Sequence, residues 1–218
     1  MRKISAFIFD LDGVITDTSE FHYLAWQRLA DEEGIPFSRE DNEKLRGVSR
    51  RESLQLMLKG RVISEETAQA WMERKNNYYI DLVKSLDPEG ILPGVMPLLK
   101  DLRQAGIAAA IASSSKNASL VIERLALKPF FDAIVDGLMV TRSKPAPDLF
   151  LRAAQELGKS PDECVVVEDA GAGVEAGKAA GMLTLGLGPH ERVGAADLVL
   201  PDLNHAKLTE ILARLQAV

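Results

Sequence analysis

Short, unbroken apolar runs recur along the chain, and polar residues or glycines follow them. The runs that predict strands are residues 4–9, 108–112, 164–167, 183–187 and 198–200. Runs of this kind are typical of strands that are buried on both faces of a parallel sheet. Stretches with helical spacing separate them, at residues 95–105, 119–127, 148–157 and 173–180. This alternation predicts a doubly wound, Rossmann-like α/β sheet.

Residues 17–90 break the alternation. They contain helical patterns at residues 23–33, 51–59 and 65–84, and no clear apolar run separates these patterns. We therefore expect a helical cap domain over residues 17–90, inserted into an α/β core domain made of residues 1–16 and 91–218. The first linker begins just after Asp12 and Gly13, and residues 87–90 form the second. The expected architecture is a two-domain clamp with its hinge beside acidic residues.

Polar side chains follow three of the predicted strands at their carboxyl ends, where ligands bind in open α/β sheets. Taken singly, such groups usually cap helices or are solvated. Their joint placement at strand ends, with one further lysine in a loop between strands, predicts a site. The residues concerned are Asp10, Asp12, Ser113, Ser114, Ser115, Lys116, Asn117, Lys144, Glu168 and Asp169.

Carboxylates brought this close together repel one another, and a hard divalent cation removes the conflict. Oxygen ligands of this type suit Mg²⁺, and the side-chain candidates are Asp10, Glu168 and Asp169. The serines and Lys144 can hold a phosphate by hydrogen bonds and charge. A metal, a cation and a carboxylate nucleophile together predict phosphoryl transfer.

These strand-end residues resemble the motifs of the haloacid dehalogenase superfamily. Residues 9–14, Phe-Asp-Leu-Asp-Gly-Val, are similar to its first motif, and Ser113, Lys144 and the pair Glu168 and Asp169 are similar to the other three. The resemblance implies a core of that type with a helical cap. It makes Asp10 the nucleophile that forms an aspartyl-phosphate. Asp12 becomes the general acid and base, and its backbone carbonyl joins the side chains of Asp10, Glu168 and Asp169 on Mg²⁺. The presence of Asp12 disfavours dehalogenation and phosphonate hydrolysis.

The cap carries a closer resemblance, to the β-phosphoglucomutase family. The residues that carry it are Thr16, Asp17, Thr18, His22, Trp26, residues 45–50, Ser53, Leu54, Arg74, Lys75 and Asn76, with residues 112–117 of the core. That family interconverts β-D-glucose 1-phosphate and D-glucose 6-phosphate through a bound β-glucose 1,6-bisphosphate. One departure is Arg46, where we expect lysine in the family's pattern, and the two side chains are not interchangeable in hydrogen-bond geometry.

The resemblance also assigns roles to individual residues. Thr18 lies at the hinge, and His22 and Lys75 contact Asp12. The predicted catalytic residues are therefore Asp10, Asp12, Thr18, His22, Ser113 and Lys144. Arg50, with Ser115, Lys116 and Asn117, holds the phosphate distant from Asp10. The full predicted substrate-binding set is Arg46, Gly47, Val48, Ser49, Arg50, Ser53, Lys75, Ser115, Lys116 and Asn117.

The composition limits the kinds of molecule that the protein can bind. The chain has 26 Lys and Arg against 32 Asp and Glu, a net charge of −6, which argues against nucleic-acid binding. A single cysteine, Cys164, excludes an internal disulfide and a cysteine zinc cluster, and we expect it in the core. No apolar stretch approaches the length of a membrane span. We expect a cytoplasmic enzyme, able to work as a monomer, with a small sugar phosphate as its partner and with His190 and His205 on the surface.

Two other functions fit parts of the same sequence. An Mg²⁺-dependent phosphatase for sugar phosphates or other small phosphomonoesters would share Asp10, Asp12 and the metal, with water as the acceptor. A sugar-phosphate-binding protein of this fold would need no nucleophile. The cap residues around Arg50 favour the mutase over both, because a mutase must hold two phosphates at once.

Overall fold

The computed structural model describes residues 3–217; residues 1, 2 and 218, which belong to the predicted core domain, lie outside the described residues. A six-stranded sheet of order β3-β2-β1-β4-β5-β6 forms the core, and every neighbouring pair is parallel. The strands are β1 (Ala6–Phe9), β2 (Ala108–Ala112), β3 (Ala133–Val135), β4 (Cys164–Glu168), β5 (Leu183–Leu187) and β6 (Leu198–Leu200). This arrangement confirms the predicted doubly wound fold.

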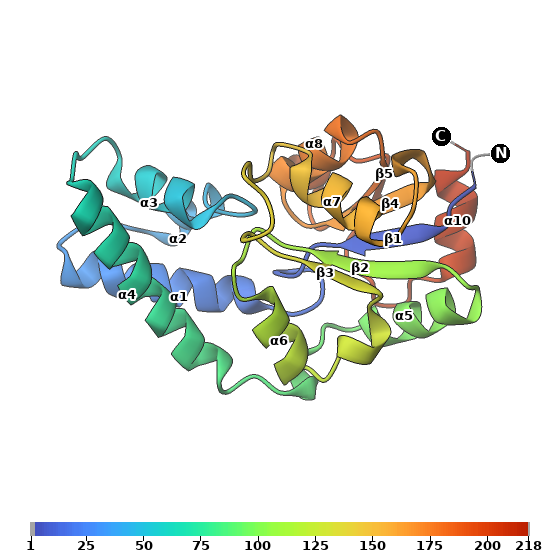
Figure 1. Ribbon diagram of the computed structural model, residues 1–218, viewed down its shortest axis with the longest axis horizontal. Coiled ribbons are helices and arrows are strands. Elements are labelled where there is room, and N and C mark those ends of the chain that lie inside the picture. The colour runs from blue at the N-terminus through green and yellow to red at the C-terminus, as the bar shows by residue number, and fades with distance from the viewer. Residues whose placement is uncertain (1–2, 218) are drawn as a thin grey trace.

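Helices cover both faces of the sheet, which explains the unbroken apolar runs. Alternate residues of a strand point to opposite faces, so Phe7 packs with the cluster that α5 and α6 complete, and Ile8 packs with α7 and α8 (Figure 1). Cys164 is buried in β4. The core helices are α5 (Val95–Gln104), α6 (Ala118–Arg124), α7 (Asp148–Glu156), α8 (Gly171–Ala179), α9 (His190–Val193) and α10 (Leu208–Leu215), with short 3₁₀ turns at Pro88–Gly90, Lys128–Phe130 and Pro161–Glu163.

The sequence pattern does not predict β3, α2, α9 or α10. β3 has three residues, of which only Val135 is buried, so its apolar run is too short to stand out. α1 begins at Thr18, five residues before the predicted start at residue 23, because its first turn carries polar residues that face the site.

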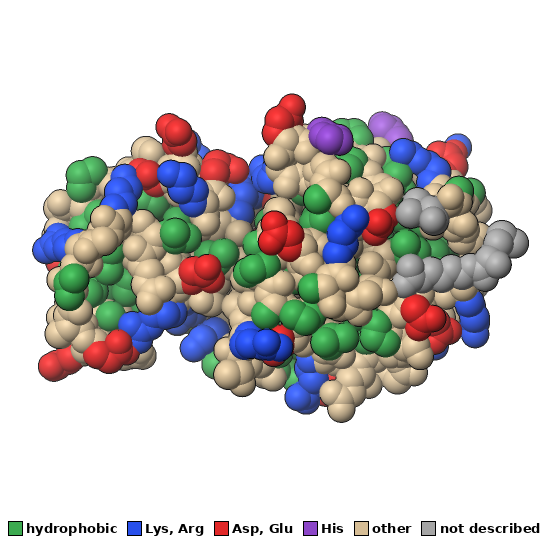
Figure 2. Space-filling view, turned by 90° about the horizontal axis from the view of Figure 1, so that it is seen from above, with side chains coloured by type: hydrophobic (Ala, Val, Ile, Leu, Met, Phe, Trp, Pro, Cys, Tyr) green, Lys and Arg blue, Asp and Glu red, His purple; other side chains and the backbone are tan. Residues whose placement is uncertain are grey.

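The second lobe is helical. It consists of α1 (Thr18–Glu32), α2 (Arg39–Glu43), α3 (Arg50–Leu58) and α4 (Glu65–Val83), and it lies beyond the carboxyl end of β1 (Figure 1). Its own apolar cluster contains Trp26, Leu29, Met57 and Trp71. Figure 2 shows the surface narrowing between this lobe and the core. None of the described helices has the length and hydropathy that crossing a membrane requires.

The chain crosses between the lobes twice, and the two crossings are hydrogen-bonded to each other. Thr16 pairs with Ile91, the Thr16 hydroxyl donates to the Gly90 carbonyl at 2.7 Å, and the Leu92 amide donates to the Ile15 carbonyl at 2.9 Å. The predicted limits of the cap, residues 17 and 90, fall at these crossings. The division into two domains stays a prediction.

Candidate active site

Three buried carboxylates meet where the strand order reverses. Asp10 follows β1, Glu168 ends β4 and Asp169 follows it, and β1 and β4 are neighbours in register. One oxygen from each of the three carboxylates lies within 4.8 Å of the others. This position, between the two halves of the sheet and beyond the strand ends, is where such folds bind ligands.

Lys144 supplies a cation to the cluster. It is completely buried, and its ammonium donates hydrogen bonds to Asp10 Oδ1 and, at 2.5 Å, to Glu168 Oε1. Burial acts to lower the pKa of Lys144, but the charges of Asp10 and Glu168 outweigh it and raise this pKa above its ordinary value. Lys144 therefore stays protonated and offsets part of the negative charge.

The cluster still holds more negative charge than it can balance. Burial and the neighbouring carboxylates raise the pKa of Glu168 to about 8 and that of Asp169 to about 7. These carboxyl groups would hold protons near neutral pH unless another cation approached. Hard oxygen donors with surplus negative charge suit Mg²⁺ better than softer metals, so the donor set fits the predicted Mg²⁺.

Two glycines leave room for the carboxylates. A Cβ on Gly13, where φ is +85°, would lie 2.3 Å from Asp169 Oδ2. A Cβ on Gly173 would lie 1.9 Å from Glu168 Oε1. Both distances are far inside van der Waals contact, so only glycine allows the carboxylates to lie where they do.

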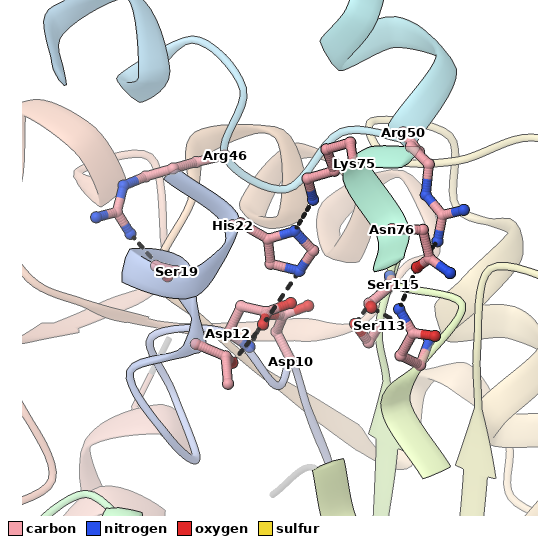
Figure 3. Close-up of polar contacts among 12 residues, drawn as sticks. Asp10, Asp12, Ser19, His22, Arg46, Arg50, Lys75, Asn76, Ser113 and Ser115 are labelled. Atoms are coloured by element: carbon pink, nitrogen blue, oxygen red, sulfur yellow. Dashed lines mark hydrogen bonds and ion pairs between the residues drawn. The ribbon is translucent and has the colours of Figure 1, made fainter. Parts of the chain in front are cut away.

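A row of polar side chains, Lys75, His22 and Thr18, extends from the cap to Asp12 (Figure 3). The Thr18 hydroxyl donates to Asp12 Oδ1 at 2.5 Å, and His22 Nε2 lies 3.7 Å from the same oxygen. Lys75 Nζ lies 2.6 Å from His22 Nδ1. The ring of Tyr79 stacks on that of His22 with centroids 4.0 Å apart, which fixes the plane of the imidazole.

The electrostatics of this row favour acid–base chemistry at Asp12. Burial, and then the charge of Asp10, raise the pKa of Asp12 to about 6. Burial lowers the pKa of His22 well below its ordinary value, with Lys75 and Arg50 adding to the effect, so the imidazole is neutral. When Lys75 is protonated its ammonium can only donate, so Nδ1 accepts and Nε2 presents a hydrogen to Asp12. A carboxyl group with this pKa can both give and take a proton near pH 7.

A third group of side chains lies at the other end of the cleft. Arg50 Nη2 and Asn117 Nδ2 both donate to Asn76 Oδ1, at 2.8 and 2.9 Å. The backbone amide of Asn117 donates to Ser115 Oγ at 3.2 Å. Ser113 is completely buried, and its hydroxyl accepts from the Ser115 amide at 3.1 Å. This run of residues follows β2, the strand paired with β1, and reaches the cap through Asn117.

Arg46 binds acidic side chains. Its Nη1 donates to Asp169 Oδ2 at 2.8 Å and its Nε to Glu43 Oε1 at 3.2 Å. Burial acts to lower the pKa of Arg46, but Asp169 and Glu43 raise it overall. The predicted substrate-binding residue thus holds a candidate metal ligand. Ser49 has a structural contact of its own, because its hydroxyl caps α3 by accepting from the Glu52 amide at 3.2 Å.

The cleft between cap and core collects most of the predicted site residues. Those on its wall are Asp10, Asp12, His22, Arg46, Gly47, Val48, Arg50, Ser53, Lys75, Ser115, Lys116 and Asp169. Thr18, Ser113, Lys144 and Glu168 are buried. His190 and His205 are exposed. Side chains that the sequence interpretation gave no role are Ser19, Asn42, Leu45, Asn76 and Tyr79. Asn76 lies beside Lys75 in the quoted motif, which is the signal that could have found it.

Comparisons with known proteins agree with this geometry. The model of the haloacid dehalogenase-like hydrolase family matches residues 4–181. The chain is 46% identical over 201 residues to a β-phosphoglucomutase of Bacillus subtilis, covering 90% of this chain and 89% of that protein. It is 32% identical over 184 residues to a phosphorylated carbohydrates phosphatase of Thermotoga maritima, covering 82% of each. The crystal structure of a β-phosphoglucomutase from Clostridium difficile matches with a TM-score of 0.95 at 40% identity, covering 98% of both chains. These similarities confirm the resemblance found in the sequence: the chain belongs to the haloacid dehalogenase-like hydrolase family.

Proposed function

We propose that this protein is a β-phosphoglucomutase that interconverts β-D-glucose 1-phosphate and D-glucose 6-phosphate through an aspartyl-phosphate and β-glucose 1,6-bisphosphate. The observation that carries the proposal is the pair of phosphate-binding groups in one cleft. Lys144 donates to Asp10, and Ser113 follows β2, the strand paired with β1, whereas Arg50 and Asn117 meet at Asn76 of the cap. The similarity to the Bacillus subtilis and Clostridium difficile enzymes supports it.

In one half-reaction a carboxylate oxygen of Asp10 attacks one phosphorus of the bound bisphosphate, and the bond from that phosphorus to the sugar oxygen breaks, which gives an aspartyl-phosphate and a hexose monophosphate. Mg²⁺ held by Asp10, Glu168, Asp169 and the Asp12 carbonyl would offset charge on the transferred group. The Asp12 amide donates to Asp10 Oδ2 at 3.0 Å, which fixes the nucleophile's orientation. Lys144 and Ser113 hold the phosphate oxygens.

Asp12 moves the proton in both directions. It protonates the sugar oxygen that leaves phosphorus, and it later takes the proton from the opposite hydroxyl as that oxygen attacks the aspartyl-phosphate. Its raised pKa suits both steps. The second of these steps forms the bisphosphate, which reverses its orientation before Asp10 attacks its other phosphorus, so each phosphate must fit each end of the cleft. Arg50 and Asn117 meet this need at the cap end.

A phosphatase acting on sugar phosphates is the second candidate, favoured by the similarity to the phosphatase of Thermotoga maritima. It would use the same nucleophile, with water in place of the second hydroxyl. A coupled assay with β-glucose 1-phosphate, Mg²⁺ and a trace of the 1,6-bisphosphate separates the two. We expect glucose 6-phosphate without matching free phosphate. Free phosphate without glucose 6-phosphate would make the protein a phosphatase. A cytoplasmic location, a monomeric state and the absence of nucleic-acid partners stay predictions.

A further inference from the structure

Asn76 joins the cap to the core through a single atom. It lies on α4, and its Oδ1 accepts one hydrogen bond from Arg50 Nη2 at 2.8 Å and another from Asn117 Nδ2 at 2.9 Å (Figure 3). Arg50 begins α3 in the cap, whereas Asn117 immediately precedes α6 in the core. The two side chains assigned to the distal phosphate therefore come from different lobes, and Asn76 holds them together.

The amide orients Arg50 without neutralising it. Neighbouring cap arginines are paired with carboxylates: Arg51 binds Glu65, with Nη1 to Oε2 at 2.9 Å, and Arg46 binds Asp169. Within residues 3–217 no carboxylate forms an ion pair with Arg50, and its hydrogen-bond partner is the neutral Asn76. A guanidinium held by a neutral acceptor keeps its full charge for an anion, and one held by a carboxylate does not.

Asn76 also leaves donors free for a phosphate. A guanidinium has five N–H donors and a side-chain amide has two, and each side chain gives one of them to Asn76 Oδ1. The remaining donors suit phosphate oxygens, which accept hydrogen bonds. The Ser115 hydroxyl, which accepts from the Asn117 backbone at 3.2 Å, fixes the other side of this group.

The same helix places the acid–base row. Lys75 precedes Asn76 and reaches His22 Nδ1 at 2.6 Å, in the row that ends at Asp12. Consecutive residues of an α-helix differ by about 100° in direction, so the two side chains of α4 serve different groups. A single placement of α4 on the core therefore brings the row of Lys75 and His22 to Asp12 and also brings Arg50 together with Asn117.

We propose that Asn76 is a positioning residue that assembles the distal phosphate site when the cap is seated on the core, so that binding of the distal phosphate favours the closed arrangement in which Asp12 acts. This inference rests on the proposed mutase function. Asn76 itself need not touch the substrate; it acts through Arg50 and Asn117.

Asn76→Ala tests the proposal, with Asn77→Ala as the matched control because Asn77 is the next residue of α4 and is exposed. Hydrogen bonds to charged groups contribute about 1.5–3 kcal/mol, so we expect kcat/KM for β-glucose 1-phosphate to fall about 10- to 100-fold in Asn76→Ala, mainly through KM. Hydrolysis of acetyl phosphate, which has no second phosphate, should fall less than about threefold, since the Asp10 end is not altered. Asn77→Ala should match the wild type in both assays.

Two further variants separate positioning from a structural role. Asn76→Asp keeps an oxygen acceptor for both partners but neutralises Arg50, so it should lose at least as much activity as Asn76→Ala. In the double variant Asn76→Ala/Asn117→Ala the losses should be clearly smaller than the product of the single losses.

Several results would overturn the inference: equal losses with both substrates, full rescue by Asn76→Asp, or independent effects of Asn76 and Asn117. Failure of the proposed function would look different, because the wild type itself would then form no glucose 6-phosphate. In that case the ratio of KM for the sugar phosphate to KM for acetyl phosphate still tests the role of Asn76.

Discussion

Stability of the metal-free protein should fall as pH rises, and Mg²⁺ should remove this dependence. The cause is the carboxylate cluster, in which the pKa of Glu168 is raised to about 8 and that of Asp169 to about 7. In the unfolded chain both groups ionise near their ordinary values of about 4. At pH values between the unfolded-state and folded-state pKa values, the folded state binds more protons than the unfolded state. The free energy of unfolding therefore decreases with increasing pH.

The magnitude follows from the same values. Between about pH 5.5 and 8.5, ionising Glu168 costs the folded state about 3 kcal/mol and ionising Asp169 about 2 kcal/mol, at 1.36 kcal/mol per pH unit. When one of the two carboxyl groups stays protonated, it no longer repels the other. We therefore expect the free energy of unfolding to fall by a total of about 3 to 5 kcal/mol. For a chain of this length that corresponds to a decrease in Tm of roughly 10 °C. Mg²⁺ bound by the ionised carboxylates would stabilise the folded state most at high pH.

The assay is thermal unfolding in EDTA and in saturating Mg²⁺ at about pH 5.5, 7 and 8.5. The difference in Tm between the two conditions should grow with pH. Glu168→Gln removes one of the repelling charges, so without metal it should be less sensitive to pH than the wild type and should gain less from Mg²⁺. Two results would refute the reasoning. One is a difference in Tm between Mg²⁺ and EDTA that does not change with pH in the wild type. The other is a pH dependence of this difference that is the same in Glu168→Gln as in the wild type.

Three further predictions concern the reaction. Arg50→Ala should lower mutase kcat/KM about 100-fold while acetyl phosphate hydrolysis falls far less, because we propose that the lost charge binds the distal phosphate; equal losses in the two assays would contradict this role of Arg50. Asp10→Asn should lower turnover by at least about 10⁴-fold and abolish labelling of the protein by a phosphoryl donor, since it removes the proposed nucleophile; retained metal-dependent turnover would exclude the aspartyl-phosphate. Thr18→Val removes a hydrogen bond to ionised Asp12, so the pKa of Asp12, about 6 in the structure, should rise by about one unit. The acidic limb of the pH profile of kcat/KM should move upward with it, and an unmoved limb would exclude this control of Asp12.

Much of the fold and the location of the candidate site can be predicted from the sequence. The apolar runs before Asp10, Ser113 and Glu168 predict strands, and the rule that ligands bind beyond strand ends predicts that their polar ends meet. Local patterns carry this information because a strand buried on both faces must be apolar throughout. The interruption at residues 17–90 predicts the helical lobe, α1 to α4, in the same way. β3 was not predicted because its three residues, two of them only partly buried, are too few to form such a run.

The tertiary structure decided what the cap side chains bind. Arg46 resembles a substrate-binding residue in sequence, yet it lies on Asp169, 123 positions away. Asn76 meets Arg50 of the cap and Asn117 of the core, and Tyr79 stacks on His22 of another helix. The raised pKa of Asp12 likewise depends on burial beneath the cap and on the charge of Asp10. Periodicity along a chain specifies which face of an element is buried, but these contacts depend on how the helical lobe packs against the sheet, which no local pattern encodes.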